Sequence, residues 1–510
     1  MTSQWETEIQ TLESTVEQLE REIQRLLSHK TDCLRRLNEL KASTAILPVE
    51  TLSTVFEHVC SDTNFLPITL GGVSTHWREI VWSSPRLWTF IRISLVSEAT
   101  GYPESYSNLL QLYFSNARSL PISIHLCGLA TRVTSQRLAT VSRRCFLNLI
   151  FHDYPTRIQA LSLTGISSSW WDDIFRCARP NLLSALRTLD LAWSTTIRRT
   201  DHIHFSIPTL TRVTLAGHLI PLELPWKQLT CLKLIGLPID RCLYLLFECP
   251  LLEEYQCDLP RWIHPERSEF HSILFRTDVV LPNLREFGWW FLTDGWTDFL
   301  MNVQYPSLRR LWSLASISDF HRSSIHPLPH YFIENTPNLE SFSGDIRFLW
   351  RGPSPDGYTV SVDDENVDEG VSGVLSAEKL DELCVRNLDI NDLRFIFDHL
   401  TICHHPAYWD SLGTLRTLSV HGSRLEQDLF EMDVFTSFVD FLQSKRSGRK
   451  IDTNECKRLT CIRLSPIDSL EKADRLSGEM VSRLETLRQL VREGLQIELV
   501  GSSGKTKLWS

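Results

Sequence analysis

Segments of the form Leu-x-x-Leu-x-Leu recur along the chain, and this repetition limits the folds that the chain can adopt. Some copies carry another residue at the fourth or sixth position, and the copies begin at Leu186, Leu210, Leu229, Leu284, Leu308, Leu339, Leu380, Leu415 and Leu459. Each copy predicts a short strand whose alternate side chains point into a core. One such unit cannot bury its own apolar face, so we expect the copies to stack into a solenoid.

The copies are irregularly spaced. Successive first leucines lie 24, 19, 55, 24, 31, 41, 35 and 44 residues apart, and a weaker copy at Leu252 divides the longest gap. The residues between copies, such as 239–249 and 393–400, are expected to form helices or irregular crossovers. The array resembles a loose leucine-rich repeat domain, and the predicted fold class is α/β. A doubly wound α/β sheet is the alternative that the pattern leaves open.

The first 42 residues carry a heptad pattern. Residues alternately four and three apart form a stripe, made by Trp5, Ile9, Leu12, Val16, Leu19, Ile23, Leu26, Lys30, Cys33, Leu37 and Leu40. The stripe predicts a coiled-coil helix, in which Lys30 would lower stability and help to fix the register. Two interpretations stay open. One is a homodimer through residues 1–42, and the other is a long helix that folds back on its own domain.

Residues 47–88 contain the signals of a small helical module. Pro48 can open a helix, because the N–H that proline lacks would be unpaired at that position. An apolar stripe with spacings of three and four follows, made by Leu52, Val55, Phe56 and Val59. A second short helix is expected around Trp77, and Pro85 is expected to end it.

The order of these signals resembles the F-box, the module that docks on the Skp1 adaptor of a cullin ubiquitin ligase. Leu-Gly-Gly-Val at 70–73 and Ser-Pro-Arg-Leu-Trp at 84–88 look most like F-box proteins of mushroom-forming fungi. The positions that match the family's apolar and aromatic residues are Leu47, Pro48, Leu52, Val55, Phe56 and Trp77. The resemblance implies that these contribute to Skp1 binding, although some would instead form the core of the module.

This resemblance implies a substrate-recognition adaptor of an SCF-type (Skp1–cullin–F-box) ubiquitin ligase. Its partners would be a Skp1-like adaptor, through it a cullin, and a protein target on the solenoid. The adaptor itself would not be an enzyme. The alternative is a non-catalytic coiled-coil scaffold that binds proteins without assembling a ubiquitin ligase.

The target would contact the outward-facing strand positions of the repeats. Those positions carry basic and aromatic side chains, namely Arg212, Lys233, Trp290, Arg310, Trp312, Arg386, His421 and Arg463. Such a set would suit an acidic or phosphorylated segment of a target. The alternative is that they are scattered solvent-facing charges. The identity of the target does not follow from the sequence.

Composition narrows the class of protein. A net charge of −10 argues against a dedicated nucleic-acid binder, which would normally be basic. The 13 cysteines include no Cys-x-x-Cys pair, which predicts reduced thiols in the cytoplasm or nucleus. A Glu- and Gln-rich N-terminus is unlike a secretory signal, and no apolar run is long enough to span a membrane.

Two motifs resemble ligand-binding sites, but neither has the residue spacing that such a site requires. Gly501–Thr506 resembles a phosphate-binding loop, but Leu499 occupies the place of its first glycine and no helix can follow. Cys403-His404-His405 lacks a second pair of ligands at zinc-finger spacing. We therefore expect neither a cofactor nor a metal.

The predicted domains are a coiled-coil helix at 1–42, an F-box at 43–92 and a solenoid at 93–510. Within the solenoid, residues 351–373 are acidic and rich in Gly and Pro, which predicts a mobile insertion. Residues 443–458 carry Lys445, Arg446, Arg449 and Lys450, and a basic loop is expected there.

Overall fold

The computed structural model describes part of each region of the chain. The main described ranges are 2–41, 47–62, 66–95, 103–128, 139–166, 183–193, 207–217, 222–261, 279–289, 303–313, 336–345, 379–386, 415–422, 431–446, 459–467, 478–501 and 504–509. The chain divides into two compact units, residues 1–186 and 187–510.

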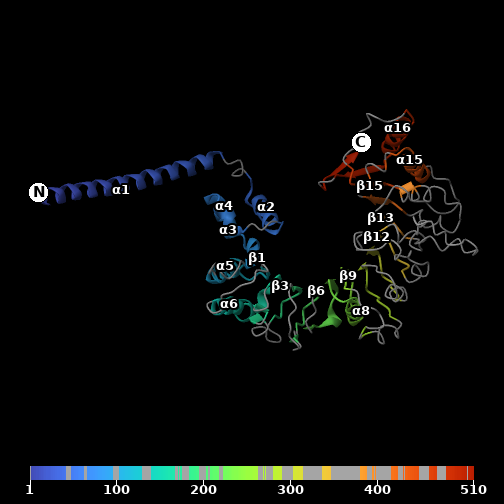
Figure 1. Cartoon of the computed structure of the whole chain (residues 1–510), viewed down its shortest axis with the longest axis horizontal. Coiled ribbons are helices and arrows are strands. Elements are labelled where there is room, and N and C mark those ends of the chain that lie inside the picture. The colour runs from blue at the N-terminus through green and yellow to red at the C-terminus, as the bar shows by residue number, and fades with distance from the viewer. Residues whose placement is uncertain are drawn as a thin grey trace, which may run out of the picture. The chain divides into compact units, whose positions relative to one another are not determined.

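The first unit begins with α1 (Thr2–Lys41), a single long helix drawn in blue in Figure 1. Three shorter helices and a 3-10 turn follow: α2 (Val49–Asp62), α3 (Pro67–Gly71), α4 (Thr75–Ser83) and η2 (Pro85–Trp88). Ser74 caps α4, because its hydroxyl accepts a hydrogen bond from the Trp77 N–H at 3.1 Å. The helix around Trp77 and its end before Pro85 are therefore as predicted.

Strands begin directly after these helices. They are β1 (Phe90–Leu95), β2 (Ile122–Gly128) and β3 (Ile158–Thr164), which pair in parallel in that order. Between them lie α5 (Pro103–Asn116), α6 (Ala139–Asn148), η4 (Leu149–Asp153) and η5 (Pro155–Arg157). The Leu-x-x-Leu-x-Leu pattern does not find these strands, because they alternate isoleucine or leucine with other residues and lack its first leucine. Strand-and-helix units thus start well before Leu186.

The second unit is built on one sheet. Its strands are β4 (Thr188–Ala192), β6 (Arg212–Ala216), β8 (Cys231–Ile235), β9 (Glu254–Asp258), β10 (Glu286–Trp289), β11 (Arg310–Ser313), β12 (Ser341–Asp345), β13 (Glu382–Arg386), β14 (Thr417–His421), β15 (Cys461–Ser465), β16 (Gln496–Val500) and β17 (Thr506–Trp509). They lie in sequence order, and all pairs are parallel except β16 with β17. A doubly wound sheet reverses its strand order at a switch point, so that alternative is excluded. A minor sheet joins β5 (Ile203–His204) and β7 (Leu222–Glu223).

A proline turn leads into many of these strands. At Leu210, for example, the backbone N–H donates to the carbonyl of Ile207 at 3.2 Å, and Pro208 lies between them. The same bond joins Leu308 to Tyr305 at 3.1 Å across Pro306. Proline suits the second position of such a turn because its φ is already fixed near the required value. The proline two residues before many first leucines therefore marks where a strand starts.

Apolar side chains stack from strand to strand beneath the sheet. One row is at most 3% exposed at every position: Leu189, Val213, Leu232, Tyr255, Phe287, Leu311, Phe342, Leu383, Leu418, Ile462 and Ile497. Burying each such side chain contributes about 1.5–3 kcal/mol. The helix α8 (Ile239–Glu248) adds Leu243 and Leu246, both fully buried. The second unit is thus a leucine-rich-repeat-like stack with one continuous core.

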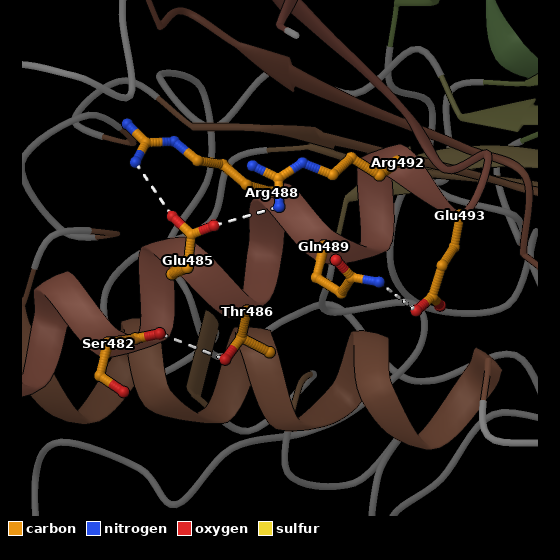
Figure 2. Close-up of polar contacts among 7 residues, drawn as sticks. All are labelled: Ser482, Glu485, Thr486, Arg488, Gln489, Arg492 and Glu493. Atoms are coloured by element: carbon orange, nitrogen blue, oxygen red, sulfur yellow. Dashed lines mark hydrogen bonds and ion pairs between the residues drawn. The ribbon is translucent and has the colours of Figure 1, made fainter.

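Near the C-terminus, α15 (Met432–Arg446) packs against α16 (Gly478–Arg492). Figure 2 shows the exposed face of α16, where the Glu485 carboxylate accepts from Arg488 at 3.3 Å and from Arg492 at 3.2 Å. Because α15 continues to Arg446, the predicted basic loop at 443–458 starts too early. Buried Phe438, Phe441 and Leu442 extend the apolar face of α15 to its last turn.

Several predicted features lie outside the described residues. They are the rest of the basic loop, the acidic insertion at 351–373, Cys403-His404-His405 and most of 393–400. The C-terminal glycine-rich segment connects β16 to β17, and Gly504 there has a φ of +75°.

Two glycines after neighbouring strands offer a matched test of this geometry. Both Gly217 and Gly236 have positive φ, at +96° and +68°. A Cβ on Gly217 would overlap the Trp193 carbonyl oxygen, whereas the nearest atom to a Cβ on Gly236 is 4.0 Å away. We expect Gly236→Ala to cost about 1 kcal/mol and Gly217→Ala about 3 kcal/mol or more. Urea unfolding of the full chain would measure both, and equal losses would contradict the proposed close approach.

Candidate functional site

The helices α2 to α4 expose a set of apolar side chains, which we call the helical surface. Its members are between 37% and 58% exposed, namely Leu47, Val49, Val55, Ile68, Val73 and Trp82. They come from three consecutive helices and the segments beside them. Exposed apolar side chains mark a protein interaction site where they lie together as one patch, so these residues are candidates for such a site.

The six residues predicted to contact Skp1 divide between surface and core. Leu47 is 41% exposed, Val55 is 46% exposed, and Pro48 is also exposed. Leu52 and Phe56 are buried at 2% and 1%, so they hold the module together. Trp77 is half-buried, and its ring centre lies 4.7 Å from that of Phe56.

Trp82 packs on α3 and against Trp88, and Trp88 connects these helices to α5. A Cβ on Gly71 would overlap the Trp82 ring, so the glycine lets this ring lie directly on α3. Trp88 is fully buried and donates its indole N–H to the Val81 carbonyl at 2.9 Å. Its ring also packs edge-on against Tyr113 of α5, with the centres 5.2 Å apart. The helices that carry the exposed side chains are therefore packed, through Trp88, against the first strand-and-helix unit.

The outward-facing side of the strands in the second unit is the other candidate, and we call it the strand face. Several of its arginines form ion pairs with carboxylates one or two strands away. Arg310 lies 2.9 Å from Glu286, and Arg212 lies 3.8 Å from Glu254, two strands away. These arginines are 60% exposed or more, so each ion pair contributes at most about 1 kcal/mol.

Arg463 of the strand face forms ion pairs with two glutamates. Its guanidinium lies 2.5 Å from Glu498 and 3.7 Å from Glu382. The hydrogen bond to Glu498 raises the pKa of Arg463, and burial acts against this rise. The strand face thus carries a lattice of positive and negative side chains. The sequence predicted mainly basic ones.

Trp312 contributes a single aromatic ring to this lattice. It is half-buried and lies in register beside Gly288 on β10. A Cβ on Gly288 would overlap the Trp312 indole, so the glycine gives the ring room to lie across the adjacent strand. Sequence reasoning found Trp312 and missed Gly288. A glycine inside a strand is itself the signal of such a close approach.

The remaining predicted residues are spread along the strand face. Lys233 is half-buried in register with Gln256, Arg386 is exposed, and Trp290 lies outside the described residues. Burial lowers the pKa of His421, and the positive charges of Arg386 and Arg463 lower it further.

Five thiols of the described residues are buried as core side chains, whereas those of Cys33 and Cys145 are exposed; the buried ones are Cys60, Cys242, Cys249, Cys257 and Cys461. Burial raises the pKa of Cys60 to about 11 and that of Cys231 to about 12, so both stay protonated near neutral pH. A protonated thiol is a poor nucleophile and a poor metal ligand. Within the described ranges, no three His, Cys, Asp or Glu side chains gather as a metal site, and no helix has the length and apolarity to cross a membrane.

Comparisons with known proteins leave the family open. No family model matches the chain, and no curated protein matches it. One solved structure that matches is the crystal structure of a TLR13–ssRNA13 complex, with 13% identity and a TM-score of 0.30. The match covers 66% of this chain and 48% of that chain. At this level it supports no inference, and the leucine-rich-repeat-like class follows from the strand order and core described above.

The pKa of His421 predicts a pH dependence of stability. Since this pKa is lowered in the folded chain, the unfolded chain binds the proton more readily. The contribution of His421 is therefore complete above its ordinary pKa of about 6.5 and declines as the pH falls toward the lowered value. Between about pH 7.5 and 5.5, we expect the melting temperature of His421→Asn to fall by less than that of the wild type. The exposed His58→Asn serves as the control, and an unchanged loss in His421→Asn would contradict the prediction.

Proposed function

We propose that this protein is a substrate-recognition adaptor of an SCF-type ubiquitin ligase. The observation that carries the proposal is the helical surface, which lies within the stretch that resembles an F-box. The order of Leu-Pro, an amphipathic helix, Trp-Arg and Pro-Arg-Leu-Trp supports a docking module. Its direct continuation into β1 supports a role in carrying a target-binding domain.

Burial divides five of the six residues of the proposed Skp1 contact into two groups. Buried Leu52 and Phe56 would act through the shape of the module, and exposed Leu47, Pro48 and Val55 would touch the partner directly. Interface energy concentrates in apolar and aromatic side chains at the centre of a contact. Trp82 of the helical surface is such a side chain, and it joins the proposed contact residues.

The target would bind the strand face around Trp312. Arg212, Arg310 and Arg463 already pair with glutamates, so an acidic target would have to displace these carboxylates. A phosphoryl group carries nearly two charges and three acceptor oxygens, and it competes better for arginine than a carboxylate does. The ion pairs therefore favour a phosphorylated segment over a merely acidic one.

No bond chemistry is assigned to the chain in this proposal. Its contribution would be to hold the target beside the ubiquitin donor, which makes transfer effectively intramolecular. A cullin would join through Skp1, and the expected location is the cytoplasm or nucleus. The coiled-coil scaffold without a ligase remains the alternative, and Skp1 binding separates the two.

A charge placed on the helical surface tests the docking contact. Val55 is 46% exposed on α2, so Val55→Asp should leave the module folded while placing a carboxylate in an apolar contact. We expect Skp1 co-purification to fall at least about tenfold, and the double variant Leu47→Ala, Pro48→Ala to abolish it.

The matched control is Val481→Asp, since Val481 is 55% exposed on α16 in the other unit. It should co-purify with Skp1 as the wild type does. Equal Skp1 recovery from Val55→Asp and the wild type, with both chains folded by circular dichroism, would refute the ligase proposal.

A further inference from the structure

The apolar stripe of α1 is uncovered within the part of the chain that the structure describes. Ile9, Val16, Leu19 and Ile23 are between 53% and 58% exposed, and Leu12 is 61% exposed. A helix with such a stripe gains stability by packing it on another apolar surface. A strict heptad stripe fits best against a second heptad helix, so a second copy of α1 is the matching surface.

The charges of α1 are unevenly distributed along the helix. Residues 2–22 hold six glutamates and one arginine, a net charge of −5. Residues 23–41 hold five Lys and Arg residues, one Asp and one Glu, a net charge of +3. A parallel pair would place halves of like charge side by side. An antiparallel pair would place each acidic half along the basic half of the second copy, which is electrostatically favourable.

The positions that flank the stripe favour the same orientation. In the heptad, Ile9 takes position a and Leu12 position d. A parallel pair brings each g residue beside an e residue of the next heptad on the second helix. Glu8 would then meet Glu13, and Arg36 would meet Lys41. Both contacts are repulsive, and each occurs twice in a symmetric dimer.

Lys30 favours the antiparallel orientation independently. It occupies position a, and in a parallel pair position a faces position a of the second copy. Two ammonium groups would then meet at the apolar seam. In an antiparallel pair position a faces position d, so Lys30 lies opposite a leucine and its charged end reaches solvent.

We propose that the protein forms a homodimer through an antiparallel, two-stranded coiled coil of its α1 helices. Isoleucine or valine at a with leucine at d favours two strands, a preference known from parallel pairs, and the charges set the direction. The register places Val16 of one copy opposite Cys33 of the other and Lys30 opposite Leu19. Its midpoint coincides with the switch from acidic to basic charge between Glu22 and Arg25.

Antiparallel pairing has a consequence for the modules that follow. At 1.5 Å per residue, the C-terminal ends of the two α1 helices would lie roughly 50 Å apart. The two copies of the helical surface would therefore emerge from opposite ends of the coiled coil. This inference does not depend on the ubiquitin ligase proposal.

Disulfide trapping in the full chain tests orientation and register together. Val16→Cys would place a thiol opposite Cys33 of the second copy, within the distance that a disulfide spans. Under mild oxidation we expect Val16→Cys to form a covalent dimer on a non-reducing gel and the wild type to stay uncrosslinked. Adding Cys33→Ser to Val16→Cys should abolish the dimer. Ile23→Cys, on the same stripe seven residues away, should not form it.

Each other outcome overturns the proposal. In a parallel pair Cys33 would face its own copy, so a wild-type covalent dimer that Cys33→Ser removes shows parallel pairing. A Val16→Cys dimer that persists after Cys33→Ser shows the same. If Ile23→Cys crosslinks through Cys33 as well as Val16→Cys does, the register is wrong. If sedimentation equilibrium finds the wild-type chain monomeric up to its solubility limit, the helices do not pair.

Discussion

The structure of the second unit depends on the backbone hydrogen bonds that join the start of each strand to the strand before it. Two successive backbone N–H groups at the start of a strand donate to the carbonyl of the residue that directly precedes the neighbouring strand. Arg309 and Arg310 both donate to Arg285 at 2.9 Å, and Thr460 and Cys461 both donate to Arg416 at 2.9 and 3.0 Å. Because the same pair of bonds recurs at the starts of β6 and of β8 to β15, these strands share one register despite the unequal lengths of chain between them. The side-chain period of two then sends corresponding residues to the same face.

That register explains the charge lattice of the strand face. Arg310 reaches Glu286 because the register places the two residues in one row on neighbouring strands. Arg463 and Glu498 are aligned in the same way on β15 and β16. The pairing depends on which residues the register brings together, and a single repeat does not contain that information. A list of outward-facing basic residues therefore overstates the positive charge of the surface.

The period of the leucines was sufficient to predict the strands β4, β6 and β8 to β15, because burial on one face requires that spacing. The leucine pattern did not predict the earlier strands β1 to β3. Isoleucine fills much of their core, and the first leucine of the pattern is missing. In the helical module, the stripe of Leu52, Val55 and Phe56 predicted α2 correctly. Spacing alone did not show that Val55 faces solvent while its neighbours are buried. That distinction depends on how α3 and α4 pack, which is a tertiary contact. Likewise, only the cross-strand register revealed that Gly288 makes room for Trp312.

The pairing of α1 bears on how two weak binding surfaces would act together. Each chain presents one strand face, and a surface built on exposed ion pairs and one aromatic ring would bind a single segment weakly. A dimer presents two such faces, and a second binding event then benefits from the high effective concentration that the first one creates. That benefit requires a target able to span both sites. This requirement favours oligomeric targets and targets that carry more than one binding segment.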